Sequence, residues 1–315
     1  AFAADLGETV AQLNSIQSLW LNHECAMKQM AGYSFGTYVP PELVDEMVKD
    51  PDSYSMKAVN KELTVMFCDM RGFTRMSEQM EPVQLQELLN AVFSRLTEHI
   101  RANRGTIDKY MGDCVMAFWG APVEAQDHAQ LAVKAALEMS GAIAAINAEH
   151  RARGIPEIGI GIGLNTGGMC VGDMGSNIRR SYTVIGDSVN LGSRLEGLSK
   201  SYGVDIVVSE TTRKMATDFA WQELDKVRVK GKEQAVAIYF PLGPSQDLPG
   251  ETASELKTWG AFVKAYRAQD WDQADVLLIN LTRTNAKKYL YQLYSERVAS
   301  MRMLPFDPEW DGATN

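Results

Sequence analysis

The chain has 315 residues, 45% of them hydrophobic and 23% charged, so it can bury a sizeable core without disulfides or a structural metal. Its formal net charge of −9 argues against broad binding to nucleic acid or anionic membranes, although a small phosphorylated substrate needs only a few local cations. Its four cysteines lack metal-ligand spacing and indicate a reducing, cytoplasmic location. No window approaches eighteen apolar residues. Because the chain begins with Ala1, the sequence leaves room for a membrane or sensor domain upstream.

Residues 1–59 are predicted to form a helical and linker segment. Leu6, Val10, Leu13 and Trp20 follow a short heptad-like pattern, weakened at one position. The pattern fits a helix packed on its own domain and a helix paired with a second copy about equally well. A second helix is expected after the adjacent prolines of YVPPELVDEMVKD, and a polar connector follows it.

Residues 60–242 alternate between strand and helix patterns. The order is strand, helix, two strands around a tight turn, helix and strand, which predicts the βαββαβ order of a ferredoxin-like α+β sheet with flanking helices. The predicted elements are a strand at 63–70, a helix at 82–104, two strands in 105–120, a helix at 127–154, a Gly-rich hairpin at 158–176, a helix at 188–203, and late strands at 205–210 and 227–240.

A Pro/Gly linker is predicted at 241–250, which separates a helical extension, residues 243–315, from the preceding domain. Residues 251–300 read as a pair of helices with aromatic side chains at intervals. We expect these aromatic residues to pack in a core and not to bind a ligand: Trp259, Phe262, Tyr266 and Trp271.

Two aspartates stand in strand-like runs, where unpartnered carboxylates are unusual. Asp69 ends a strand and precedes a loop into a helix, where the backbone at Phe73 and Thr74 suits phosphate oxygens. Asp113 follows the turn of the next hairpin, and the two strands lie side by side in a ferredoxin-like sheet. Two close carboxylates repel unless they share a proton or a cation, so the pair predicts Mg²⁺ or Mn²⁺ held together with substrate phosphates. The alternative is that one aspartate caps a helix and the other stabilises a turn. This alternative explains each aspartate when it is taken singly.

A polar pair is predicted on the helix at 188–203. Asn190 and Arg194 are four residues apart and therefore share a face. An amide and a guanidinium on one face suit a sugar oxygen and a phosphate, although such a pair seen alone is more often solvated surface.

Four motifs carry a resemblance to a known family: FCDMRGFT, DKYMGDCVMAFWG, YTVIGDSVNLGSRLE and VKGK. In their order and spacing they resemble the catalytic domain of the class III nucleotidyl cyclases, in particular the bacterial receptor-type adenylyl cyclases with a Lys/Thr base-reading pair. In this family two domains pair head to tail and form active sites at their interface. The resemblance implies a homodimer with two Mg²⁺ or Mn²⁺ ions per site, which converts ATP into 3′,5′-cyclic AMP and pyrophosphate by attack of the ribose 3′-hydroxyl.

The resemblance assigns the metals to Asp69 and Asp113 and the reading of the adenine base to Lys109 and Thr183. Many relatives carry aspartate where this chain has Thr183, but a hydroxyl can both donate and accept, so it can still receive a hydrogen bond from the adenine amino group. The threonine variant is associated with bicarbonate-responsive relatives, and bicarbonate is therefore a candidate regulator.

The remaining motif positions are expected to contact ribose and phosphates. The resemblance assigns ribose orientation and stabilisation of the transition state to Asn190 and Arg194, and the triphosphate to Lys230. Gly168 stands where some relatives place an arginine aimed at the phosphates, which puts that one contact in doubt.

Three other functions are alternatives to this interpretation. A guanylyl cyclase usually carries glutamate and a small polar residue in place of Lys109 and Thr183. A diguanylate-forming enzyme shares the sheet and the metal pair, but the chain has no GGDEF-type turn. A catalytically inactive, nucleotide-sensing dimerisation module usually loses a metal aspartate or the transition-state arginine, and here both are present.

Overall fold

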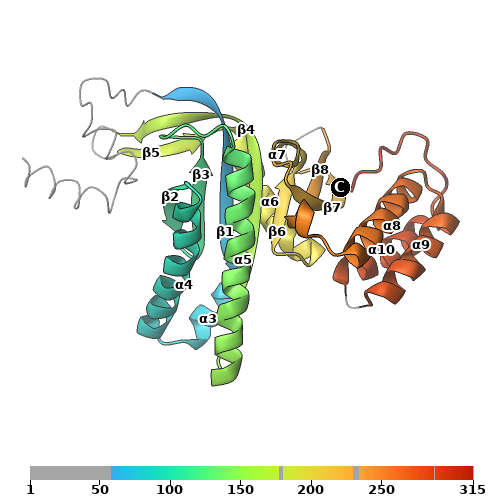
Figure 1. Cartoon of the computed structure of the whole chain (residues 1–315), viewed down its shortest axis with the longest axis horizontal. Coiled ribbons are helices and arrows are strands. Elements are labelled where there is room, and N and C mark those ends of the chain that lie inside the picture. Colours follow the sequence, from blue (N-terminus) through green and yellow to red (C-terminus); the bar gives the residue numbers. More distant parts are fainter. Residues whose placement is uncertain (1–57, 177–179, 230–233, 287, 315) are drawn as a thin grey trace, which may run out of the picture. The chain divides into compact units, whose positions relative to one another are not determined.

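The computed structural model describes residues 58–176, 180–229, 234–286 and 288–314. The predicted N-terminal helices and Lys230 lie outside these residues. The chain divides into two units, one made of Ala1–Ala58 and Gly172–Tyr182 and the other of Val59–Val171 and Thr183–Asn315. The second unit holds every candidate site residue that the structure describes, and its elements are labelled in Figure 1.

The first seven described elements, from β1 to β4, confirm the ferredoxin-like prediction. The strands are ordered β2-β3-β1-β4, and β1 runs antiparallel to both of its neighbours. This is the order that two βαβ crossovers around a central hairpin produce. The elements are β1 (Val59–Arg71), α3 (Phe73–Gln79), α4 (Pro82–Ala102), β2 (Thr106–Met111), β3 (Cys114–Trp119), α5 (His128–Arg153) and β4 (Gly159–Gly175).

The sheet continues beyond β4 with later strands, so the full order is β2-β3-β1-β4-β6-β8-β7, and β5 pairs with β4 off this path. The expected late strands are confirmed: β6 is parallel to β4, and β7 and β8 form an antiparallel pair. The added elements are β5 (Arg180–Ile185), α6 (Asp187–Tyr202), β6 (Ile206–Ser209), α7 (Glu210–Met215), β7 (Phe219–Val227) and β8 (Val236–Pro244).

Alternation along β1 distributes side chains to the two faces of the sheet. Met66, Cys68 and Met70 belong to the core that α4 and α5 cover. Val65 and Phe67 face α6, where they lie beside Gly192. Figure 1 shows α5 lying across β1, and the contacts at Gly192 place α6 on the opposite face of this strand. Asp69 follows the same alternation and therefore lies on the α6 face.

The hairpin predicted at 158–176 is wrong, because this segment is one long strand, β4. Its glycines are needed for close packing of α6 and not for a turn. A Cβ atom on Gly163 would lie 2.2 Å from the backbone nitrogen of Glu196, and one on Gly161 would lie 2.4 Å from Oγ of Ser199. Side chains at these positions would push α6 away from the sheet.

The C-terminal extension contains three helices where a pair was predicted: α8 (Gly250–Arg267), α9 (Trp271–Thr284) and α10 (Tyr289–Met301). The predicted linker is also shorter, because β8 extends to Pro244 and the 3₁₀ turn Ser245–Asp247 follows directly. Core packing of the aromatic residues is confirmed for Trp259, Phe262 and Tyr266, which are at most 4% exposed, and Trp271 packs against the same core. We call α8–α10 the C-terminal bundle.

One described helix, α5, has the length and hydropathy of a membrane span over His128–Ala152. Its apolar face, however, packs on the sheet, with Ala132, Val133, Ala136 and Met139 fully buried in the core beneath it. We therefore interpret α5 as a core helix.

Candidate active site

The two predicted metal aspartates lie next to each other at the same end of the β1–β3 pair. Asp69 is paired directly with Cys114 in the antiparallel register, and Asp113 is the residue before Cys114, at the tip of the β2–β3 hairpin. The prediction that the two carboxylates face each other is consistent with this register. Neither aspartate is fully buried, so a ligand can reach both of them.

The electrostatics of this pair are unfavourable for a protein without a bound cation. Burial, followed by the charge of Asp113, raises the pKa of Asp69 to about 6. The same surroundings act on the adjacent thiol: burial and then Asp69 raise the pKa of Cys114 to about 12. Hard oxygen donors under mutual repulsion fit a divalent cation. No group of three metal-ligating side chains with suitable geometry occurs among the described residues.

A third carboxylate, Glu196 on α6, was missed by the sequence analysis. Its Oε1 lies over Gly161, which is the β4 residue paired with Asp69. Burial and then the charge of Asp69 raise the pKa of Glu196 to about 7, and Arg71 opposes the shift. Only the packing of α6 on glycines brings this side chain to the aspartates, and the sequence pattern by itself gave no sign of it.

The two residues that the resemblance assigns to reading of the base are in contact. Nζ of Lys109 donates to Oγ1 of Thr183 at 3.2 Å, and the two residues come from β2 and from β5. Thr183 is 7% exposed, whereas Lys109 reaches solvent.

Asp108 completes this cluster and was also missed. The hydroxyl of Thr183 donates to Oδ2 of Asp108 at 2.5 Å, and Oδ1 of Asp108 lies 3.2 Å from Nζ of Lys109. Burial raises the pKa of Asp108, and the hydrogen bond from Thr183 opposes the shift. Strict alternation would place Asp108 and Lys109 on opposite faces, but the register of β2 shifts between Ile107 and Lys109. A bulge at this point lets consecutive side chains reach the same partner.

Asn190 and Arg194 share one face of α6, as their spacing predicted. Asn190 is exposed and Arg194 is partly buried. Nη1 of Arg194 is buried and has no hydrogen-bond partner among the described residues. A buried guanidinium nitrogen without an acceptor is costly, so a ligand oxygen at this position would satisfy it.

The loop after Asp69 leads into the short helix α3, which begins at Phe73 after Gly72 in the left-handed region, at φ 75°. The Phe73 side chain packs against the core under α4 and α5, and Thr74 is exposed. The expected contribution of these two residues to phosphate binding could therefore come only from the backbone of the first turn and the Thr74 hydroxyl.

Comparison with known protein families identifies the family to which this chain belongs. Residues 56–242 match the model of the adenylate and guanylate cyclase catalytic domain. The chain belongs to this cyclase family. The match contains all the predicted site residues, including Lys230.

Among relatives of known sequence, adenylate cyclase 1 of Rhizobium meliloti is 34% identical over 240 residues, which are 76% of this chain and 35% of that protein. The adenylate cyclase of Anabaena cylindrica is 37% identical over 190 residues, which are 58% of this chain and 37% of that protein. The chain thus spans little more than a third of the length of these relatives.

Solved structures of both kinds of cyclase resemble the described fold. The adenylyl cyclase CyaB from P. aeruginosa superposes with a TM-score of 0.56 and 36% identity, covering 61% of this chain and 100% of that one. The guanylyl cyclase Cya2 gives 0.54 and 34%, covering 60% and 96%. The two TM-scores are close, so overall similarity to these structures does not distinguish ATP from GTP as the substrate. The cluster of Lys109, Thr183 and Asp108 is the local feature that bears on this choice.

Proposed function

We propose that this chain is the catalytic part of an adenylyl cyclase that converts ATP into 3′,5′-cyclic AMP and pyrophosphate. In the proposed reaction the ribose 3′ oxygen forms a bond to the α-phosphorus, the bond to pyrophosphate breaks, and the hydroxyl proton is released. The observation that carries the choice of nucleotide is the hydrogen bond from Thr183 to Asp108.

The Thr183 hydroxyl has a single hydrogen, and Asp108 takes it. The oxygen of Thr183 is thereby left to accept, first from Lys109 and then from a ligand. Adenine offers an amino donor beside a ring-nitrogen acceptor, which complements an accepting Thr183 and a donating Lys109. Guanine offers a carbonyl oxygen and a ring N–H at the equivalent edge, so it would place acceptor against acceptor at Thr183.

Asp69 and Asp113 would hold the divalent ions, which in the proposed enzyme are two Mg²⁺ or Mn²⁺ per site. When bound, such ions activate the attacking hydroxyl and neutralise charge on the leaving group. The mutual repulsion of the two carboxylates supports this assignment, since a cation would relieve it.

Arg194 is proposed to stabilise the negative charge that develops around the α-phosphorus in the transition state, and Asn190 is proposed to orient the ribose. The buried Nη1 of Arg194 without a protein partner supports an anionic ligand at this place. Lys230, which lies outside the described residues, is proposed for the triphosphate on its motif alone.

A head-to-tail homodimer with shared active sites is part of the proposal. Tyr110, Met111 and Ile185 are 51%, 43% and 55% exposed, although they are large and apolar and lie on the strands that carry Lys109 and Thr183. A second copy that covers them would bury this surface beside the base-reading cluster. Bicarbonate as a regulator, an upstream sensor or membrane domain, and a cytoplasmic location remain predictions from the sequence.

The test measures cyclic nucleotide formation from ATP and from GTP with Mn²⁺ and with Mg²⁺, for the wild type, Thr183→Val and Asp108→Asn. We expect cyclic AMP from the wild type and little cyclic GMP. Thr183→Val removes the acceptor without changing the side-chain shape and should lower kcat/KM for ATP about tenfold.

Asp108→Asn should reduce the preference for ATP over GTP, because an amide can donate to Thr183 and free its hydroxyl to donate to guanine. Preferential cyclic GMP formation by the wild type would favour a guanylyl cyclase. A dimeric wild type that makes neither product would favour the inactive module.

A further inference from the structure

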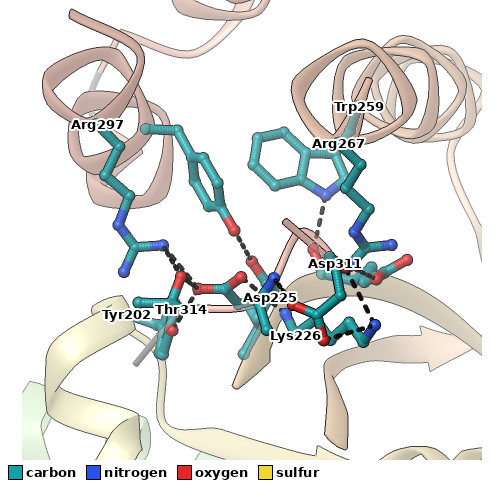
Figure 2. Close-up of polar contacts among 12 residues, drawn as sticks. Tyr202, Asp225, Lys226, Trp259, Arg267, Arg297, Asp311 and Thr314 are labelled. Carbon is teal, nitrogen blue, oxygen red and sulfur yellow. Dashed lines mark hydrogen bonds and ion pairs between the residues drawn. The ribbon is translucent and has the colours of Figure 1, made fainter. Parts of the chain in front are cut away.

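The last turn of α6 is attached to the C-terminal bundle through a buried carboxylate. Figure 2 shows Arg297 on α10 and Tyr202 at the end of α6 directed at Asp225 of β7. Oδ2 of Asp225 accepts from Arg297 at 2.6 Å, from Tyr202 at 2.6 Å and from Thr314 at 2.8 Å. Asp225 is 3% exposed. We call Asp225, Tyr202, Arg297 and Thr314 the Asp225 cluster.

Packing reinforces this attachment. Gly203 ends α6 in the left-handed region at φ 64°, and a Cβ atom there would lie 2.7 Å from the ring of Tyr289, the first residue of α10. The ring of Tyr202 also lies under the Arg297 guanidinium, 5.6 Å from its centroid. Burial and the charge of Asp225 raise the pKa of Tyr202, so its hydroxyl keeps the proton that it donates.

The residues of α6 divide into three faces, which follow from 3.6 residues per turn. Gly192, Glu196 and Ser199 face the sheet, where they contact β1 or β4. Leu191, Leu195 and Tyr202 join the core that contains the C-terminal bundle. The third face carries only two of the residues named for the site, Asn190 and Arg194.

We propose that the C-terminal bundle positions α6 through the Asp225 cluster, so that Arg297, Asp225 and Tyr202 are positioning residues for Asn190 and Arg194. This inference rests on the proposed function, and it assigns to the extension a part in catalysis. A helix held by the sheet on one side alone can slide or tilt, and an error of about 1 Å at a catalytic group costs up to about a hundredfold in rate. Lys109 and Thr183 lie on β2 and β5 and should not be moved.

The kinetic test compares the full chain with Arg297→Ala, Arg297→Lys and Tyr202→Phe. Arg297→Ala should lower kcat for cyclic AMP formation by about tenfold to a hundredfold, with KM for ATP changed less than about twofold. Tyr202→Phe removes one hydrogen bond and keeps the ring, so it should lower kcat less; it also decides the matter if Arg297→Ala does not fold. Arg297→Lys should restore part of the loss.

Arg302→Ala is the matched control. Arg302 also lies at the end of α10, where it pairs with Asp275 at 2.5 Å and with Asp272 at 3.2 Å, both within the C-terminal bundle. Its loss should weaken the bundle without touching α6, so kcat should stay within about twofold of the wild type. An equal loss in Arg302→Ala and Arg297→Ala would overturn the proposal.

A double mutant separates positioning from a loss of active protein. If Arg297 acts through α6, adding Arg297→Ala to Arg194→Ala should lower kcat no further than about twofold. If Arg297→Ala only removes folded enzyme, the two losses will multiply, and the proposal is wrong.

Amide hydrogen exchange tests the same inference without any activity. Residues 187–202 should exchange faster in Tyr202→Phe and Arg297→Lys than in the wild type, and at the wild-type rate in Arg302→Ala. Unchanged exchange in α6 of the first two variants would overturn the inference even in an active enzyme. A wild type without cyclase activity would overturn the proposed function, while faster exchange in these variants would still support the attachment of α6.

Discussion

Carboxylates lie at two places beside α6, and their surroundings differ. At one, Asp69, Asp113 and Glu196 crowd together; Arg71 opposes the rise in the pKa of Glu196, and a backbone hydrogen bond at Met70 opposes the rise in the pKa of Asp69. At the other, a single carboxylate, Asp225, is more deeply buried but accepts from a guanidinium, two hydroxyls and the backbone N–H of Lys226 at 2.7 Å.

The difference separates a binding site from a structural one. A satisfied buried carboxylate holds elements together and gains nothing from a ligand, whereas crowded carboxylates cost stability until a cation or a proton arrives. The helix that carries Asn190 and Arg194 therefore has a repelled carboxylate at Glu196 and a satisfied hydrogen bond at Tyr202.

The largest expected effect breaks the satisfied cluster. Asp225→Ala leaves Arg297 buried without its partner, so the free energy of unfolding should fall by about 3–5 kcal/mol, measured by urea denaturation. The double variant Asp225→Ala, Arg297→Met removes both charges and should be more stable than Asp225→Ala alone. If the double variant is less stable, the carboxylate is not held by this guanidinium.

The next effect breaks the crowded cluster. Asp113→Asn should lower cyclic AMP formation about a hundredfold or more, because it removes a proposed metal ligand. Without divalent cations its melting temperature should equal or exceed that of the wild type, since a repulsion is lost. Asp247→Asn, at an exposed position, is the control. A large drop in melting temperature of Asp113→Asn would assign Asp113 a structural role.

A smaller effect sharpens the comparison by adding the cation. Mn²⁺ at ten times its dissociation constant should stabilise the wild type by about 1.4 kcal/mol, and calorimetry should detect the shift in melting temperature. Asp113→Asn should lose most of this gain, whereas Arg297→Lys should keep it. Equal stabilisation of all three proteins would place the ion elsewhere.

The smallest expected effect concerns His128, a buried histidine outside both clusters. Burial lowers the pKa of His128 from its ordinary 6.5, against the opposing charges of Glu62 and Asp127. A depressed pKa means that the unfolded chain binds the proton more readily, so stability is lost as the pH falls below about 6.5. His128→Gln should flatten the melting temperature between pH 7.5 and 5.5 relative to the wild type. A difference between the two proteins that does not change with pH would exclude this linkage.

Much of the main sheet could be predicted because the signals were local. The helical periodicity of 82–104 and the turn at Met111 and Gly112 fixed a helix and a hairpin, and the order of elements then limited the topology to a ferredoxin-like sheet. The adjacency of Asp69 and Asp113 followed from that topology alone.

Three features were not predictable in the same way. The glycines of β4 are compatible with a turn and with a strand, and only the approach of α6 over Gly161 and Gly163 decides between them. Asp108 joins Thr183 because β2 bulges, which breaks the alternation that a strand pattern assumes. Asp225 and Arg297 are 72 residues apart and resemble ordinary surface charges until the fold pairs them.

The sequence by itself determined the βαββαβ order, the cyclase family and the identity of the residues proposed for metal, base and ribose, because each depends on short spacings or on residue types within a motif. Tertiary structure alone decided which carboxylates repel each other, which charges are compensated and which contacts α6 makes. Such contacts join segments distant in the chain, and their energies depend on burial and on distance, neither of which a local pattern contains.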